Sequence, residues 1–333
     1  MLPAMETTMT NAMELSQRAQ GVPASPTLAI TARVKELKAA GEDIIGFGAG
    51  EPDFGTPEVI CDAAVESIRS GQTRYAPTPG TPEAREAIAR KLRDQNGIAC
   101  EATDIIINNG AKFTVYLALQ ALVNTGQTVL LPTPAWVSYK PMIQLAGGVV
   151  REIPAGPDSD FKMTPEQLEA AIDSDVRAII LNSPSNPCGA TYSGAEIREL
   201  AEVLSRYPHV AVIADEIYEQ LTYEDEPYLS IGSLPEMADR TVTINGLSKT
   251  FAMTGWRIGY ACAPGDGGSV IKAMTRMQSQ MTSSITSFLM SSIPAALERA
   301  GGEVQQMRQT FAERAELIHG LIKSWGEVTC PRP

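Results

Sequence analysis

The sequence predicts an α/β fold with three layers, in which a mostly parallel central sheet is covered by helices on both faces. The 333-residue chain is 44% hydrophobic and 20% charged, which suits a globular protein with a large core or two smaller ones. Short apolar runs alternate with longer segments of helical periodicity, the pattern of such sheets. Near-continuous Val and Ile in those runs is typical of strands buried on both faces.

The predicted elements follow one another along the chain. The apolar runs that we interpret as strands are 105–107, 128–131, 178–181, 210–214, 241–244 and 258–261. The segments of helical periodicity are 82–93, 112–123, 165–172, 194–207 and 267–277. Several of these helices begin with Thr-Pro or Ser-Gly, residues that favour a helix start.

A further apolar stripe recurs every three or four residues near the end of the chain and predicts one more helix. Such a stripe needs a covering element, but the chain ends at Pro333, a few residues later. We therefore expect the sequence to be a C-terminally incomplete copy of a longer protein. The stripe consists of Val304, Met307, Phe311, Ala315, Ile318, Ile322 and Trp325.

Composition excludes several classes of function. A net charge of −12 would repel a phosphate backbone, which argues against a nucleic-acid binder. The two histidines, His209 and His319, are far apart, and the five cysteines form no C-x-x-C pair, so neither a metal site nor a disulfide framework is expected. No signal peptide or membrane-spanning run is present, which favours the cytoplasm. The chemistry must depend on Lys, Asp, Tyr and Arg.

Reactive residues follow four of the predicted strands, where α/β sheets bind their ligands. Asn-Asn-Gly-Ala-Lys at 108–112 opens a helix and suits an anion, because free backbone N–H groups lie at the positive end of the helix dipole. The stiff turn at 182–189 presents the Asn186 amide. Segment 215–218 supplies the carboxylate of Asp215 and the phenol of Tyr218, and segment 245–249 supplies the amine of Lys249. Each feature alone fits a turn, a cap or a surface lysine, but their coincidence at one edge indicates a site.

Pyridoxal-phosphate catalysis requires such a set, because a lysine holds the cofactor as an imine and the ring withdraws electrons. Asp215 suits the pyridine nitrogen, which it would keep protonated. Tyr218 and Asn186 could donate hydrogen bonds to the phenolic oxygen. Lys249 would then act twice, first as the imine and later as the general base.

Five motifs carry a family resemblance, which runs from about Ser25 to the chain end. The sequence resembles the class I and II aminotransferases of pyridoxal-phosphate fold type I, and most strongly the bacterial-type aspartate aminotransferases. Relatives of that group include aspartate or glutamate:prephenate aminotransferases. The motifs are Gly-Glu-Pro-Asp-Phe at 50–54, Tyr-Ala-Pro-Thr-Pro-Gly at 75–80, Ser-Pro-Ser-Asn-Pro-Cys-Gly at 183–189, Asp-Glu-Ile-Tyr-Glu at 215–219 and Ser-Lys-Thr-Phe-Ala-Met-Thr-Gly-Trp-Arg-Ile-Gly-Tyr at 248–260.

The resemblance implies roles for individual residues around pyridoxal 5′-phosphate. Lys249 corresponds to the Schiff-base lysine, Asp215 to the partner of the ring nitrogen, and Asn186 and Tyr218 to the ligands of the ring oxygen. Tyr75 reaches the phosphate from the neighbouring subunit in the family, so a homodimer is implied. The remaining residues of the implied cofactor site are Gly110, Ala111, Ser248 and Arg257 at the phosphate and Trp136 stacked on the ring.

The resemblance also implies a substrate site and a division into domains. Gly50, with Trp136 and Asn186, corresponds to residues near the substrate carboxylate, and Lys112, Ser25 and Thr27 to those that handle a distal carboxylate. By this resemblance, residues 1–55 form an N-terminal segment and part of a small domain. Residues 56–298 form the large cofactor domain, and 299–333 an interdomain helix that begins an incomplete small domain.

The chain departs from the family pattern in three respects. Gly246 stands where many relatives have a phosphate-binding serine, and Cys188 where threonine is usual. The arginine that grips the substrate α-carboxylate in the family has no counterpart among the residues of this sequence.

The implied function is a ping-pong transamination, in which an amino acid donates nitrogen to the cofactor and a 2-oxo acid collects it. Aspartate and 2-oxoglutarate are the favoured pair. Prephenate or aromatic transamination, or a lyase reaction, would use the same fold, and an inactive cofactor-binding scaffold is a further alternative. A dehydrogenase is disfavoured because residues 46–50 lack the glycine spacing and the helix of a dinucleotide site.

Overall fold

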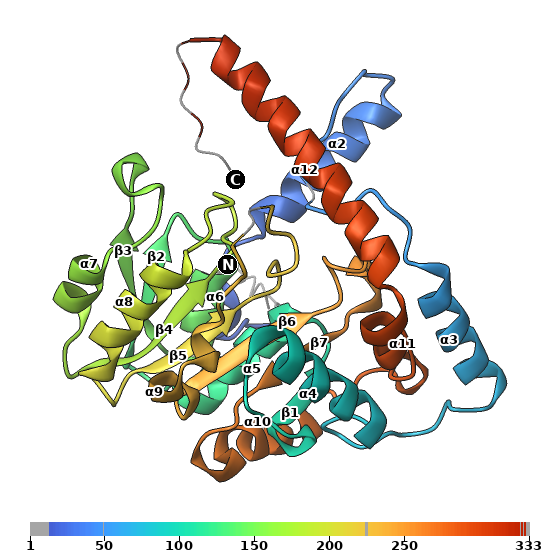
Figure 1. Cartoon of the computed structure of the whole chain (residues 1–333), viewed down its shortest axis with the longest axis horizontal. Coiled ribbons are helices and arrows are strands. Elements are labelled where there is room, and N and C mark those ends of the chain that lie inside the picture. The colour runs from blue at the N-terminus through green and yellow to red at the C-terminus, as the bar shows by residue number, and fades with distance from the viewer. Residues whose placement is uncertain (1–12, 49, 224–225, 327, 329, 331–333) are drawn as a thin grey trace, which may run out of the picture. The chain divides into compact units, whose positions relative to one another are not determined.

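The computed structural model describes residues 13–48, 50–223, 226–326, 328 and 330 (Figure 1). The chain forms two compact units, Met1–Gly48 and Ala49–Pro333. The first unit contains α1 (Gln17–Gly21) and α2 (Pro26–Ala39). The Ser25 hydroxyl caps α2 by accepting a hydrogen bond from the Leu28 N–H at 3.4 Å.

The second unit holds the sheet and the covering helices. Every predicted strand is present with bounds within two residues of those expected, and each predicted helix is present within three. The strands are β1 (Ile105–Asn108), β2 (Thr128–Thr133), β3 (Val149–Pro154), β4 (Val176–Asn182), β5 (Ala211–Asp215), β6 (Thr241–Gly246) and β7 (Gly259–Cys262). The helices are α3 (Glu58–Arg69), α4 (Pro82–Asn96), α5 (Ala111–Leu122), α6 (Tyr139–Leu145), α7 (Pro165–Ala171), α8 (Gly194–Ser205), α9 (Pro235–Ala238), α10 (Ser269–Ser279), α11 (Ser292–Arg299) and α12 (Gly301–Ser324).

Local sequence explains where the predicted helices begin. The Thr81 hydroxyl accepts a hydrogen bond from the Ala84 N–H, and Pro82 occupies the first position of α4, where its fixed φ suits a helix. At α8, Ser193 and Glu196 form a reciprocal capping box. The Thr and Ser residues that precede Pro or Gly in the predicted helix starts are thus the N-caps of these helices.

The seven strands form one sheet in the order β1-β7-β6-β5-β4-β2-β3. All neighbours are parallel except those of β7, which runs antiparallel to both β1 and β6. The prediction of a mostly parallel α/β sheet is therefore confirmed. The consequence for the site is geometric: β1, β4, β5 and β6 end at the same edge where β7 begins.

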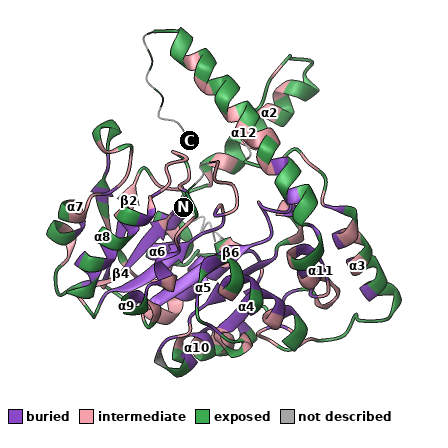
Figure 2. Cartoon of the chain, in the orientation of Figure 1, coloured by how far each residue is buried: buried purple, intermediate pink, exposed green. Residues whose placement is uncertain are grey.

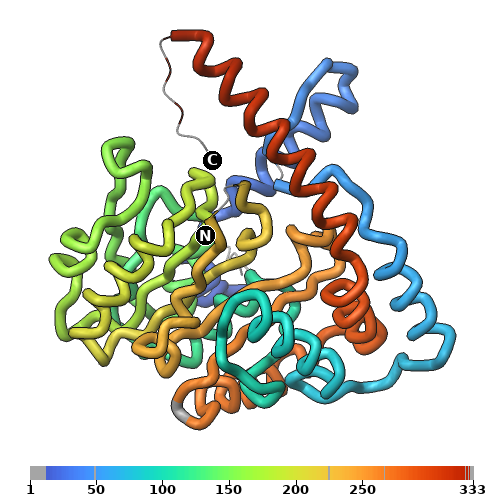
Figure 3. The backbone as a smooth tube through the Cα atoms, viewed as in Figure 1, coloured from blue at the N-terminus to red at the C-terminus, as the bar shows by residue number. Residues whose placement is uncertain are grey.

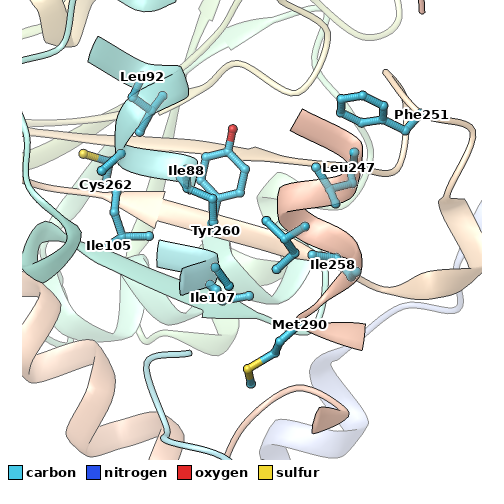
Figure 4. Close-up of a cluster of buried hydrophobic side chains, with 14 of the residues drawn as sticks. Ile88, Leu92, Ile105, Ile107, Leu247, Phe251, Ile258, Tyr260, Cys262 and Met290 are labelled. Atoms are coloured by element: carbon cyan, nitrogen blue, oxygen red, sulfur yellow. The ribbon is translucent and has the colours of Figure 1, made fainter. Parts of the chain in front are cut away.

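Apart from the edge strand β3, the sheet is buried on both faces (Figure 2). On one face, Ile106 and Ala261 pack with residues of α5, α6 and α10, while their neighbours point to the other face, as the period of two requires. That other face carries one cluster with α7, α8 and α9, and another with α4 and α11. Figure 4 shows the latter cluster, in which Ile105, Ile107 and Tyr260 pack against Ile88 and Leu92 of α4.

The strand β3 has no counterpart in the sequence prediction. β3 lies at the edge of the sheet, and Ile153 is its only buried residue. The charged residues Arg151 and Glu152 can therefore interrupt its apolar run. An edge strand has a weaker apolar signal than the central strands.

The long helix α12 follows α11, which lies beside α3 although the two are far apart in sequence (Figure 3). Val304 and Met307 are buried, but Ile318 and Trp325 are more than half exposed. The predicted stripe is thus buried in the structure only near the start of the helix, and its covering by a further segment stays a prediction. No helix in the described part of the chain is long and apolar enough to cross a membrane.

Candidate functional site

The predicted reactive residues converge where β4, β5 and β6 end. In the sheet, Asn182 lies opposite Asp215, and Asp215 opposite Ile244, so these strand ends are in register. Beyond them, a cavity of about 630 Å³ is lined by residues from several segments that are distant in sequence. The lining includes Gly50, Asn186, Cys188, Tyr218 and Lys249.

Lys249 lies in the loop directly after β6, and its ammonium group donates a hydrogen bond to the Gly50 carbonyl. It also lies 5.8 Å from the centre of the Tyr218 ring. Burial lowers the pKa of Lys249, the nearby Glu51 carboxylate opposes that shift, and the Arg257 cation adds to it. A lysine with a lowered pKa keeps more of its amine in the nucleophilic form at neutral pH.

Asp215 is the last residue of β5 and is only 3% exposed. Its carboxylate accepts hydrogen bonds from the Tyr139 hydroxyl at 2.7 Å and from the Ile217 N–H at 3.3 Å. Burial raises the pKa of Asp215 to about 6, although both hydrogen bonds lower it. A buried acid in this state is poised to face a positively charged group.

Tyr218 and Asn186 form a pair at the cavity wall. The Asn186 amide donates a hydrogen bond to the Tyr218 hydroxyl at 3.3 Å, and the Asn186 N–H is held by the Asn182 side chain at 2.9 Å. Burial raises the pKa of Tyr218, and the Asn186 hydrogen bond opposes the shift. The phenol therefore stays protonated at neutral pH and can donate a hydrogen bond.

Arg257 lies against the start of α5. Gly110 precedes this helix with a φ of 83°, and a Cβ atom there would overlap the Arg257 guanidinium. No side chain of the described residues caps the first turn of α5. Its N–H groups and the guanidinium therefore surround one place that suits an anion.

Trp136 and Lys112 border the same region. The Lys112 ammonium lies 5.0 Å from the centre of the half-buried Trp136 ring, which contacts Tyr139 edge-on at 5.3 Å. Burial, followed by repulsion from Arg257, lowers the pKa of Lys112. These contacts connect the anion region at α5 with Tyr139 and hence with Asp215.

Gly246 is required by the packing of β6 against β7. A Cβ atom on Gly246 would lie 2.7 Å from the Ile258 carbonyl oxygen and 3.0 Å from the Gly259 Cα. Both contacts are with backbone, which cannot move aside cheaply. The absence of the serine usual in the family therefore has a steric reason in this chain.

A second polar cluster is buried behind the site. Lys91 and Glu219 form an ion pair at 2.5 Å, and Asn96 also contacts both partners. Burial raises the pKa of the adjacent Glu216 to about 8, so this acid is protonated at neutral pH and hydrogen-bonded to Ser230 at 2.6 Å. The cluster anchors the segment that carries Tyr218.

Some predicted site residues lie elsewhere or have other contacts. Tyr75 is 98% exposed on the loop between α3 and α4 and does not line the cavity that Lys249 lines. Ser25 and Thr27 belong to the first unit, where Ser25 caps α2. Ser248 is buried, and its carbonyl accepts a hydrogen bond from the Met253 N–H.

Two residues around Asp215 were missed by the sequence reasoning. Tyr139 lies in α6 and is fully buried, and a buried phenol that follows a candidate stacking residue by three positions could have been examined for an acidic partner. Asn182 donates a hydrogen bond to the Asp215 carbonyl at 2.9 Å. Its place at the end of a predicted strand was the available signal.

Comparisons with known proteins agree with this arrangement. Residues 42–332 match the family described as aminotransferase class I and II. An aspartate aminotransferase of Geobacillus stearothermophilus is 44% identical over 322 residues, which are 96% of this chain and 81% of the relative. An aspartate/prephenate aminotransferase of Cereibacter sphaeroides is 43% identical over 96% of this chain and 79% of its own length.

Solved structures give the same result. The aspartate aminotransferase of Thermus thermophilus with maleate superposes with a TM-score of 0.92 at 38% identity, over 97% of this chain and 83% of that protein. An aspartate aminotransferase of Rhizobium meliloti superposes with a TM-score of 0.90 at 38% identity, over 94% and 78%. The chain therefore belongs to the class I and II aminotransferases, pyridoxal-phosphate enzymes of fold type I.

Proposed function

We propose that this aminotransferase moves the amino group of aspartate to 2-oxoglutarate. The observation that carries the proposal is that the buried Asp215 ends β5 and Lys249 follows the adjacent strand β6, at one sheet edge. The substrate follows from the relatives, several of which are described as aspartate aminotransferases. Prephenate is the second candidate acceptor, because other relatives of similar identity are described as aspartate/prephenate aminotransferases.

The residues fit pyridoxal 5′-phosphate by their chemistry. Lys249 offers an amine with a lowered pKa, and the region at Gly110 and Arg257 offers donors for a phosphate. The buried Asp215 suits a protonated ring nitrogen, because the positive charge of that nitrogen would compensate the free-energy cost of ionising the buried carboxyl group. We assign the ring oxygen to Tyr218 and Asn186. Ala111, Ser248 and Trp136 complete the proposed cofactor contacts.

When bound, the cofactor supplies an aldehyde that condenses with amines and a ring that withdraws electrons from the substrate α-carbon. The side chains of the protein transfer the proton and hold the charges. Lys249 Nζ accepts the proton that leaves the α-carbon, aided by its lowered pKa. The Asp215 carboxylate holds the proton on the ring nitrogen, and Tyr218 donates to the ring oxygen. Gly50 lies beside Lys249, where we place the substrate carboxylate.

Aspartate should act as amino donor in a single turnover. The protein loaded with cofactor is expected to be yellow, and aspartate should bleach its visible band while one equivalent of oxaloacetate is released per site. Subsequent 2-oxoglutarate should restore the band faster than prephenate does, as stopped-flow absorbance would measure. A yellow protein that no amino acid bleaches would support an inactive scaffold instead, and a faster response to prephenate would reverse the order of acceptors.

We also propose that the protein is a homodimer in which Tyr75 completes the partner's site. Its nearly complete exposure on a loop of one chain supports a role in contact with a second copy. A one-to-one mixture of Tyr75→Ala and Lys249→Ala chains should then recover about a quarter of wild-type activity, since half of the dimers hold one intact site. If Tyr75 acts within its own chain, mixing recovers nothing beyond the two separate variants.

The remaining proposals concern the distal carboxylate, the domains and the compartment. We assign the distal carboxylate of the substrate to Lys112 with Ser25 and Thr27, and place the domain boundaries near residues 55 and 298. A cytoplasmic location is supported by free thiols, which a reducing compartment maintains. The free thiols are those of Cys61, Cys100, Cys188 and Cys262.

A further inference from the structure

The segment that begins at Gly50 is fastened to the loop that carries Lys249. The Thr254 hydroxyl donates a hydrogen bond to the Glu51 carboxylate at 2.8 Å. Two residues farther along the loop, Trp256 donates to the Thr56 hydroxyl at 3.1 Å, and that hydroxyl donates to a carbonyl of the loop at 2.9 Å. The two segments are therefore tied together at several points, and the Glu51 side chain is held by one of them.

The same segment is fastened on its other side by α12. Arg314 forms an ion pair with Asp53 at 2.7 Å, and the rings of Phe54 and Phe311 meet edge-on at 5.4 Å. The Arg314 guanidinium lies 5.5 Å from the Phe54 ring centre. An exposed ion pair alone would contribute little, but combined with the ring contacts it restrains the backbone that carries Glu51.

Among the described residues, two charged groups, Glu51 and Arg257, act on Lys249. Its ammonium donates to the Gly50 carbonyl, and the next residue, Glu51, lines the same cavity as Lys249. The Glu51 carboxylate attracts the ammonium, the Arg257 guanidinium repels it, and the face of the Tyr218 ring lies 5.8 Å away. Within the described part of the chain, Glu51 is thus the acid whose charge opposes the effects of burial and of Arg257 on the pKa of Lys249.

We propose that Glu51 is a positioning residue that sets the proton affinity of the Lys249 amine, with Thr254 holding its carboxylate in place. The inference deepens the proposed function, on which its meaning for catalysis rests. An amine that accepts a proton from a substrate carbon must be neutral before the step and stable as an ammonium after it. The Gly50 carbonyl and the Glu51 charge stabilise that ammonium, while burial keeps the neutral form accessible.

The test measures the Lys249 amine in the protein without added cofactor. The rate at which a trace amine-reactive reagent labels Lys249 is followed by peptide mass spectrometry from pH 6 to 11, which yields the pKa of the amine. Glu51→Gln should lower this pKa by about 0.5 to 1 unit, because the carboxylate is exposed and its attraction is partly screened. At pH values below the pKa, labelling should then be about threefold to tenfold faster.

Matched variants separate this effect from other causes. Glu58→Gln removes an equal charge from the start of α3 and should leave the pKa of Lys249 unchanged. Glu51→Asp keeps the charge and should give a shift less than half that of Glu51→Gln. Thr254→Val should lower the pKa by a smaller amount than Glu51→Gln, whereas Thr254→Ser keeps the hydroxyl and should behave as the wild type.

The proposal is overturned if Glu51→Gln changes the pKa of Lys249 no more than Glu58→Gln does, or raises it. This outcome is independent of the proposed function, because the labelling uses the protein without cofactor. A wild type that never develops a visible band with pyridoxal phosphate would refute the transaminase assignment, and the labelling result would still stand.

Discussion

Lys249→Ala is expected to lower kcat/KM for transamination by at least about 10⁴-fold, the largest effect of any single substitution in this chain. The amine has two tasks in the proposed mechanism, holding the cofactor and moving the α-proton. Two further lysines of the region cannot assume its place, because Lys112 lies at the start of α5 over Trp136 and Lys162 forms an ion pair with Glu196 at 2.6 Å. A coupled assay of oxaloacetate release, together with the absorption spectrum, measures the loss.

The control for this variant is Lys140→Ala, which removes another lysine amine without touching the cavity. Lys140 forms an exposed ion pair with Glu152 at 2.9 Å, and such pairs contribute about 1 kcal/mol or less. Its activity and visible band should equal those of the wild type. If Lys249→Ala kept more than a hundredth of the wild-type activity, the Lys249 amine would not be the group that transfers the α-proton.

Asp215→Asn is expected to reduce kcat by about 10²-fold to 10³-fold, because a neutral amide cannot hold a proton on the ring nitrogen by charge. The side chain keeps its shape, so Tyr139 can still donate a hydrogen bond to the remaining oxygen. The visible band should persist, since Lys249 is unchanged. Wild-type kcat in this variant would show that the ring nitrogen needs no anionic partner here.

The same substitution should stabilise the protein without cofactor, and more so at higher pH. The pKa of Asp215 rises from 3.8 to about 6 on folding, so its favourable contribution is complete below pH 3.8 and is lost as pH rises through 6. The difference of about 2 units corresponds to about 3 kcal/mol. Urea unfolding should show Asp215→Asn more stable than wild type at pH 8, with the gap closing towards pH 4. Equal stability at both pH values would contradict the burial argument.

The sheet and the gathering of the site at one edge were predictable because both depend on local patterns. Apolar runs marked the central strands, and the rule that ligands bind at carboxyl ends brought together Lys249 and Asp215. The strand β3 was missed because an edge strand carries charged residues. The hydrogen bond between Tyr139 and Asp215 and the backbone contact at Gly246 depend on three-dimensional packing, so their partners could not be named from the sequence. Under the proposed homodimer, the surroundings of Tyr75 depend on a second chain, whose position one sequence does not specify.

The antiparallel direction of β7 constrains how this enzyme could diverge. Because β7 starts at the edge where β6 stops, a single short connection leads from Lys249 to Arg257. Under the proposed roles, Lys249 holds the aldehyde carbon of the cofactor and Arg257 its phosphate, so the length of that connection fixes the spacing between the two contacts. Deleting or inserting one residue between 250 and 256 would move Lys249 relative to Arg257. We expect natural variants of this chain to keep that length fixed while surface loops, such as the one between α7 and β4, vary freely.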